Sequence, residues 1–264
     1  MTGSQNSQSV KSADRALALI EFVAAEGTTN FTSILEALDL PRSSAHGLLQ
    51  TLTASGWLDH NQQSKQYSLG LRAWQVGQEY RGHKDLENIA KPVMDRLART
   101  VGETVQLARL DGIENVYIAI SESDKEMRMA SSVGSRLPAH ATGIGKALLS
   151  MLDPAEAERR LRSVMLPRYT DKTVTDVNEL MTLVEQVRTR GFGVDDEENI
   201  SGCRCVAVAL TNDVGTGVLS AISVTMPTSR TGESWPDSIV GPLILAAKEI
   251  RSILGAPDPL HTNI

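Results

Sequence analysis

The sequence predicts an α+β fold in two parts, a small helical domain at the N-terminus and a larger domain built on an antiparallel sheet. Within residues 10–70, apolar residues recur at helical spacing and a hairpin pattern follows them. From residue 104 onward the pattern changes to strands mixed with helices, with hairpins early and late. A chain of 264 residues is long enough for one large domain or two modest ones.

The composition favours a cytoplasmic protein with no membrane partner. The N-terminus lacks the apolar core of a signal peptide, and the longest apolar run, near 243–247, is far too short to span a membrane. Cys203 and Cys205 cannot form an extracellular disulfide framework. The net charge is −6, and residues 10–70 carry four basic and six acidic side chains. A prediction of DNA binding therefore depends on the placement of a few groups, not on bulk charge.

Three short helices are predicted near the N-terminus. Residues 12–25 carry apolar side chains at helical spacing and end at Gly27. Asn30 is placed to cap a second helix, and Pro41 suits the first position of a third helix because its missing N–H has no partner there. Two short helices joined by a tight turn are typical of a helix-turn-helix, whose second helix enters the major groove of DNA.

The exposed face of the third helix is small and polar. Arg42 and Gln50 can read base edges, and hydroxyl groups can hold phosphates. A hairpin over 56–69 follows, with Lys65 in its turn, which is the shape of a wing. Similar stripes occur in any small three-helix domain, but the helix order and the hairpin favour a winged helix-turn-helix. The predicted DNA-binding residues are Arg42, Ser43, Ser44, His46, Gly47, Gln50, Thr51 and Lys65.

The larger domain follows a connecting helix over 71–81, whose Leu71 and Trp74 suggest packing against another chain. Strands are predicted over 104–110, 115–121 and 127–133, and later over 192–196, 204–211 and 218–225. Helices are predicted over 85–100, over 143–152, after Asp153, after Asp176 and over 236–254. Pro92 predicts a bend or a late start in the first of these helices. We expect a disordered tail at 1–9, a DNA-binding domain at 10–70, a linker helix at 71–84, the larger domain at 85–255 and a tail at 256–264.

Three stretches resemble one family: RLPAHATGIGKALL at 136–149, RGFGVDDEE at 190–198 and GCRCVA at 202–207. With SADRAL at 12–17 and AISV at 221–224, they are similar to the IclR family of bacterial regulators, over about residues 9–254. The resemblance implies a winged helix-turn-helix, a linker helix and a GAF-like α/β effector domain. It also implies dimers that often pair into tetramers. No cofactor and no enzymatic activity are expected.

The resemblance also implies an effector site that uses the backbone of Gly143 and Ile144 and the side chains of Asp195, Cys205, Ser223 and Thr225. A helix beginning near Thr142 suits a carboxylate, and hydroxyls two residues apart on one strand face the same side. Ile144 and Thr225 are larger than their counterparts in small oxo-acid binders, which implies a more apolar pocket. We expect a repressor of a catabolic operon that binds double-stranded operator DNA and senses a small carboxylic or aromatic acid.

Other interpretations of the same residues are weaker. Gly143–Lys146 resembles a phosphate loop, but His140 stands where the first glycine is required and Ala147 replaces the metal-binding hydroxyl. His140 with the two cysteines lacks the spacing of a zinc site. Glu197 and Glu198 are expected to form a solvated turn. The alternative function is a GAF-domain enzyme or redox sensor that uses Cys205.

Overall fold

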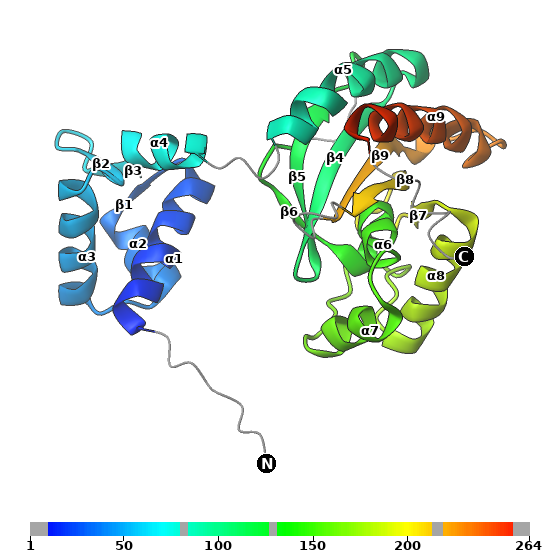
Figure 1. Ribbon diagram of the computed structural model, residues 1–264. Helices are drawn as coiled ribbons and strands as arrows, with labels where there is room; N and C mark the ends of the chain where they lie inside the picture. Colours follow the sequence, from blue (N-terminus) through cyan, green and yellow to red (C-terminus); the bar gives the residue numbers. More distant parts are fainter. Residues whose placement is uncertain (1–9, 80–83, 127–130, 213–218, 256–264) are drawn as a thin grey trace. The chain divides into compact units, whose positions relative to one another are not determined.

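The computed structural model describes residues 10–79, 84–126, 131–212 and 219–255. The chain divides into two compact units, Met1–Gly82 and His83–Ile264, which are described separately. Figure 1 shows the elements of each unit. Both expected tails, residues 80–83 of the junction and residues 127–130 of the strand predicted over 127–133 lie outside the described residues.

The N-terminal unit contains four helices and three short strands among its described residues. In chain order they are α1 (Lys11–Glu26), β1 (Thr28–Asn30), α2 (Phe31–Leu38), α3 (Arg42–Ala54), β2 (Leu58–Asn61), β3 (Gln66–Leu69) and α4 (Leu71–Glu79). The strands form one antiparallel sheet in the order β1-β3-β2. The predicted hairpin is confirmed as β2 and β3, whereas β1, which pairs with β3, was not expected because three residues carry too little pattern.

Individual residues mark both ends of α2 and the start of α3. The Asn30 side chain accepts a hydrogen bond of 3.0 Å from the backbone N–H of Ser33, which confirms the predicted cap of α2. Asp39, with φ of 46°, ends α2 in the left-handed region. Pro41 is the capping residue of α3 rather than its first helical residue, one position from the prediction. The buried core of the unit consists of Leu19, Val23, Ile34, Leu49, Leu52 and Leu58.

The C-terminal unit is a six-stranded antiparallel sheet with helices on both faces. Its elements are α5 (Lys84–Val101), β4 (Thr104–Asp111), β5 (Glu114–Ser121), β6 (Arg136–Pro138), the 3-10 turn η1 (Ala139–Ala141), α6 (Gly143–Leu149), α7 (Pro154–Arg162), α8 (Val177–Arg190), β7 (Gly193–Asp196), β8 (Cys203–Asn212), β9 (Leu219–Pro227), the 3-10 turn η2 (Thr228–Arg230) and α9 (Asp237–Leu254). The strand order is β6-β5-β4-β9-β8-β7. The predicted α+β class with an antiparallel sheet is confirmed.

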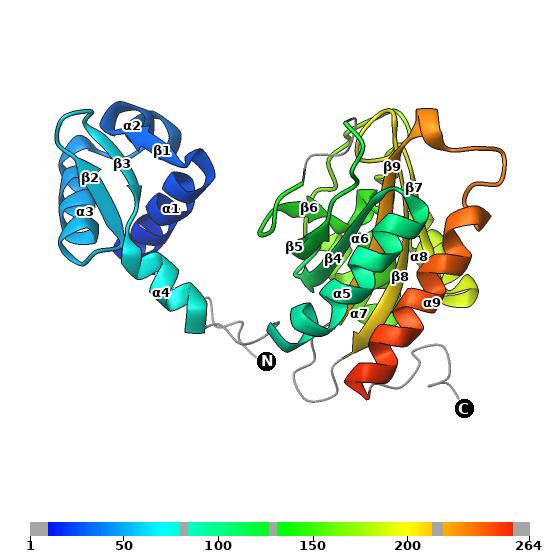
Figure 2. The same cartoon turned by 90° about the horizontal axis from the view of Figure 1, so that it is seen from above.

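Alternation along the strands separates two layers. Helices α5 and α9 lie side by side on one face of the sheet, as Figure 2 shows, and pack on apolar strand residues such as Leu107, Val206 and Val224. The opposite face carries α6, which contacts β8 and β7, with α7 and α8 beyond it. A second apolar cluster, which includes Ala108, Ile144, Leu148 and Ala207, lies between α6 and the sheet.

Three expectations for this unit need correction. The strand expected over 127–133 is absent from its described part, 131–133; a strand forms instead at Arg136–Pro138, which pairs with β5. Helix α6 ends at Leu149, three residues earlier than predicted. Helix α5 begins eight residues before Pro92 and continues through it, so Pro92 does not delay the helix. Among the described helices, none is both long and apolar enough to cross a membrane.

Candidate functional site

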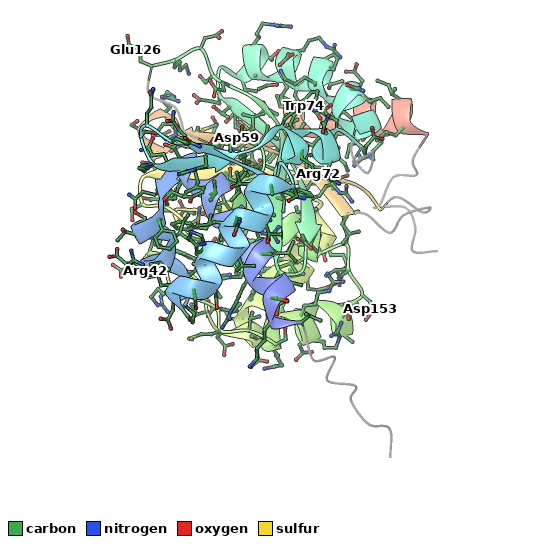
Figure 3. The ribbon with its side chains drawn as sticks, turned by 90° about the vertical axis from the view of Figure 1, so that its left-hand side faces the viewer. Arg42, Asp59, Arg72, Trp74, Glu126 and Asp153 are labelled. Atoms are coloured by element: carbon green, nitrogen blue, oxygen red, sulfur yellow. The ribbon has the colours of Figure 1, made fainter. Side chains whose placement is uncertain are left out.

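The outward face of α3 carries the residues predicted to contact DNA. Arg42, Ser43, His46, Gly47, Gln50 and Thr51 are exposed and Ser44 is half-buried, while Ala45, Leu49 and Leu52 of the same helix enter the core. Figure 3 shows this side of the N-terminal unit, with Arg42 at the beginning of α3. Lys65 is exposed in the turn between β2 and β3, where its φ of 57° is left-handed.

Two side chains on α3 already have partners within the unit. The guanidinium of Arg42 lies 5.5 Å from the centre of the Phe31 ring, which orients it without neutralising its charge. The hydroxyl of Thr51 donates to the carbonyl of Gly47 at 2.9 Å, so it can offer only its lone pairs to another molecule.

Gly47 stands in the middle of α3 without a packing reason. A Cβ atom at this position would meet no atom within 4 Å, and glycine inside a helix is less stable than alanine by about 1 kcal/mol. Because Gly47 has no side chain, another molecule can approach the backbone of α3 closely at this position.

A cavity of about 130 Å³ lies in the C-terminal unit, on the α6 side of the sheet. Strand register explains its composition, because Thr225, Cys205 and Asp195 pair in one row across β9, β8 and β7. Gln106 pairs with Ser223 in the neighbouring row. The residues that line the cavity are Gln106, Tyr117, Ser131, Ser135, Leu137, Thr142, Asp195, Asn199, Ile200, Cys203, Cys205 and Thr225.

Close backbone packing holds α6 against this end of the sheet. A Cβ at position 193 would lie 2.3 Å from the carbonyl oxygen of Gly143, and a Cβ at Gly143 would lie 3.1 to 3.3 Å from atoms of Asp195 and Cys205. Only glycines allow this approach without displacing the backbone. The first turn of α6 therefore borders the cavity, and the hydroxyl of Thr142 caps it by accepting from the N–H of Gly145 at 3.1 Å.

Buried hydroxyls surround one amide on the cavity wall. The side-chain oxygen of Gln106 accepts hydrogen bonds from Thr225 at 2.7 Å and from Ser223 at 3.2 Å. The amide nitrogen of Gln106 donates to the hydroxyl of Ser131 at 3.0 Å. These groups form a connected polar network inside a layer that is otherwise apolar.

Asp195 faces the cavity from β7 and is 4% exposed. Burial raises the pKa of Asp195 to about 7, against the opposing effects of the Glu198 backbone N–H and the Lys146 charge. Its carboxylate accepts from that N–H at 2.7 Å. At neutral pH this carboxyl is therefore divided between its two protonation states.

The expectation for Glu198 is wrong, because its carboxylate is buried and paired. The ammonium of Lys146, 3% exposed, donates to Glu198 from α6. The carbonyl of Glu198 accepts a hydrogen bond from the hydroxyl of Thr173 at 2.5 Å. This bond is a second contact, besides the ion pair with Lys146, that holds the turn after β7. Glu197 matches the expected surface position better, and its carboxylate accepts from Lys172 at 2.9 Å near the surface.

The two cysteines lie on β8 with buried thiols. Burial raises the pKa of Cys205 to about 12, and the Asp195 charge adds to this, while the neighbouring Thr225 and Ser223 side chains and the Ile144 backbone oppose it. Burial likewise raises the pKa of the Cys203 thiol to about 12. Both side chains stay as neutral thiols at neutral pH, and a neutral thiol is a poor nucleophile.

Most residues predicted for the effector site lie together, with one difference. Asp195, Cys205 and Thr225 line the cavity, while Gly143 and Ser223 border it. The side chain of Ile144 points away into the apolar cluster between α6 and the sheet, so it does not make the cavity more apolar as expected. The residues that sequence reasoning missed include Gln106, whose signal was a single polar residue inside the apolar strand sequence TVQLA.

The residues of the phosphate-loop and zinc alternatives have other partners. Lys146, the lysine of the loop-like sequence, is paired with Glu198. The ring of His140 is buried, and its Nε2 lies 3.0 Å from the carbonyl of Pro167. Across the described part of the chain, no group of three or more histidine, cysteine or acidic side chains is arranged to hold a metal ion.

Comparison with known proteins agrees with these two units. Residues 12–62 match the model of the IclR helix-turn-helix domain, and residues 78–252 match that of the bacterial transcriptional regulator IclR C-terminal domain. The transcriptional repressor AllR of Salmonella paratyphi A is 36% identical over 251 residues, which cover 94% of this chain and 91% of AllR. The transcriptional regulator BhcR of Paracoccus denitrificans is 32% identical over 248 residues, covering 94% of this chain and 88% of BhcR.

Solved structures agree as well. An IclR homologue from Microbacterium hydrocarbonoxydans, crystallised in complex with 4-hydroxybenzoate, is 25% identical with a TM-score of 0.77, and the match covers 92% of this chain and 99% of that one. A DNA-reading domain followed by a ligand-binding domain defines a one-component transcriptional regulator, a class of protein that is not enzymatic. The chain belongs to the IclR family of bacterial transcriptional regulators.

Proposed function

We propose that this regulator senses a small carboxylic acid in the cavity beside α6, and that the bound acid changes its affinity for operator DNA. The observation that carries the proposal is the cavity itself, where hydroxyl, amide and carboxyl groups converge within an apolar layer. An enclosed space with a few convergent polar groups is the usual form of a small-molecule site.

The volume of the cavity favours a small aliphatic acid over an aromatic one. The cavity, at about 130 Å³, is small beside the roughly 300–1,000 Å³ that is typical of pockets for drug-sized ligands. A two- or three-carbon oxo or hydroxy acid fits this space. The homologue from Microbacterium hydrocarbonoxydans holds the larger 4-hydroxybenzoate, and the present cavity must expand to accept such a ligand.

The chemistry of the lining suits an acid that bears a second polar group. Ser223 and Thr225 provide hydroxyls for a carboxylate at the β9 side. Asp195, with its pKa near 7, donates to an oxo group when protonated and accepts from a hydroxyl group when ionised. The carboxylate of the acid then lies away from the carboxyl of Asp195, which avoids repulsion.

DNA binding in this proposal uses the exposed face of α3 and the Lys65 turn. Arg42 and Gln50 reach base edges, Ser43, Ser44, His46 and Thr51 lie beside them, and Gly47 allows the backbone to approach the DNA closely. Leu71 and Trp74 of α4 are 66% and 62% exposed, which supports their burial in a dimer or dimer of dimers. Two α3 helices of a dimer would read successive major grooves of a palindromic operator. We infer repression, as in the related repressor AllR.

The redox alternative that uses Cys205 is disfavoured. A sensing thiol needs a lowered pKa and access to solvent, whereas burial raises the pKa of Cys205 to about 12. Alkylation of the native protein is expected to leave Cys205 unmodified. Rapid modification that abolishes operator binding would favour the redox function.

A mobility shift with the DNA upstream of the regulator's own gene tests the proposal. The assay is repeated with glyoxylate, pyruvate, a branched aliphatic acid and 4-hydroxybenzoate. One of the small acids is expected to alter a saturable, competitor-resistant complex. Ser223→Ala should lose this response and keep DNA binding, while Ser163→Ala, on the surface after α7, should keep both. A normal response in Ser223→Ala would place the effector elsewhere.

A further inference from the structure

Gln106 places a buried amide on the wall of the cavity. It lies on β4 between Val105 and Leu107, is 2% exposed, and faces the cavity. A buried amide is unfavourable unless its donors and acceptor are satisfied, and an apolar residue of similar size would pack there without that requirement. The choice of glutamine therefore calls for a reason in the chemistry of the site.

The direction of the hydrogen bonds around Gln106 limits what the cavity can bind. Ser223 and Thr225 each have one hydroxyl hydrogen, and both hydrogens point to the Gln106 oxygen. In this arrangement the hydroxyls offer only lone pairs to the cavity. Lone pairs repel a carboxylate, so the two hydroxyls cannot hold an anion until their hydrogens turn toward it.

Rotation of the Gln106 amide reverses the network without leaving a group unpaired. Each neighbour of the amide, namely Ser131, Ser223 and Thr225, is a hydroxyl that donates or accepts equally well. After half a turn about the last side-chain bond, the amide nitrogen donates to the hydroxyls of β9 and the oxygen accepts from Ser131. This torsion is broad in glutamine, so both orientations are accessible.

We propose that Gln106 is a specificity-determining residue of the effector cavity, whose reversible amide frees the hydroxyls of Ser223 and Thr225 to donate to an anionic ligand. This role rests on the proposed function: Gln106 would let the cavity distinguish a carboxylic acid anion from a neutral molecule of the same shape. A residue at 106 that only accepts hydrogen bonds would hold both hydroxyls turned away from the ligand and would exclude anions.

Three forms of the protein separate this role from simple packing. Gln106→Glu has nearly the same shape as the native residue, but an ionised carboxylate accepts and never donates. Gln106→Met has a similar volume and gives the hydroxyls no fixed direction. Wild-type protein and both variants are titrated calorimetrically with pyruvate and with pyruvamide, which differ only in carboxylate against amide, at pH values on both sides of 7, because Asp195 changes its protonation state there.

The wild type should prefer pyruvate. Gln106→Glu should lose ~100-fold or more in pyruvate affinity while pyruvamide binding is kept or improved, which reverses the preference. Gln106→Met should bind both molecules with affinities within ~10-fold of each other. The thermal midpoint of the ligand-free Gln106→Glu variant should fall below that of the wild type, because its buried carboxylate has hydroxyl partners but no counter-charge.

Each other result overturns the inference. If Gln106→Glu and Gln106→Met keep the wild-type preference for pyruvate, Gln106 does not select the ligand, while the proposed function stands. If both variants lose both ligands equally, Gln106 has only a structural role. If the wild type binds neither molecule, the selection proposed here is wrong, and the mobility shift with the full set of acids decides separately whether the regulator senses an acid at all.

Discussion

The two units of this regulator place polar groups in opposite ways. On α3 the polar side chains stand in solvent on a helix whose other face is buried. In the C-terminal unit the polar side chains of Gln106, Ser223 and Thr225 on β4 and β9 are buried and hydrogen-bonded to one another. An exposed polar group contributes little to stability and is free to bind DNA, whereas a buried one must be satisfied in the fold before it can bind a ligand.

This contrast predicts that changes of charge are tolerated on α3 and are severe around the cavity. Lys146→Met leaves the Glu198 carboxylate buried without a partner, and we expect a loss of about 3–5 kcal/mol in the free energy of unfolding. Urea unfolding followed by far-UV circular dichroism measures it. The double variant Lys146→Met/Glu198→Leu should recover most of the loss, because it removes both charges. A single variant as stable as the wild type would mean that the pair is solvated.

The buried carboxyl of Asp195 should make stability depend on pH in the direction opposite to a surface aspartate. Its pKa in the folded protein is about 7, against about 3.9 for an unfolded aspartate. As pH rises, Asp195 therefore keeps its proton to a higher pH in the folded state than in the unfolded state. Its contribution to stability is full below about pH 4 and is lost as pH rises to about 7. The loss amounts to about 4 kcal/mol.

Asp195→Asn isolates this contribution. The stability of the wild type relative to Asp195→Asn should fall between pH 4 and pH 7 and level off above that, since the asparagine does not titrate. Unfolding curves of both proteins at several pH values give this difference directly, and effects common to both proteins cancel. A difference that is constant across the range would show an ordinary pKa for Asp195.

On the exposed side, the largest effect concerns binding and not folding. Arg42→Ala should weaken operator binding by about 1–3 kcal/mol, roughly 5-fold to 160-fold, while stability and effector affinity stay unchanged. Fluorescence anisotropy with operator DNA at fixed salt measures the loss. Arg159→Ala, an exposed position on α7 of the other unit, is the matched control. Unchanged operator affinity in Arg42→Ala would exclude the first turn of α3 from the DNA contact.

Helix caps give the smallest effects and compare the two units directly. Asn30 caps α2 in the N-terminal unit, and Asp153 caps α7 in the C-terminal unit by accepting from Ala155 and Glu156. Alanine at either position should reduce stability by about 1 kcal/mol. Hydrogen exchange should show faster opening of α2 in one variant and of α7 in the other. Faster exchange in both units from a single variant would show that they unfold together.

Local patterns were sufficient to predict most helices. The Asn30, Asp153 and Asp176 caps, the glycine that ends α8 and the hairpin of β2 and β3 follow from chemistry within a few residues of chain. The errors are also local in origin. Residues 131–133 of the strand expected over 127–133 are not in a strand, and β6 forms at Arg136–Pro138 because it pairs with β5; β1 exists because β3 offers it a partner.

The cavity shows where reasoning from sequence stops. Asp195, Cys205 and Thr225 were named from resemblance to a family, and no local pattern joins them. They lie together because three strands pair in one register, which brings residues far apart in the chain into a single row. The environment of Glu198 was misjudged for the same reason, since its partner Lys146 comes from α6.

By itself the sequence determined the class of fold, most helix ends, the polar face of α3 and the absence of a disulfide framework, because each depends on neighbouring residues or on composition. Only the tertiary structure decided that Ile144 turns away from the cavity and that Gln106 joins the hydroxyls of β9. Only the fold buries Asp195 deeply enough to raise its pKa to about 7. These features depend on strand register and burial, which arise when distant segments of the chain pack together.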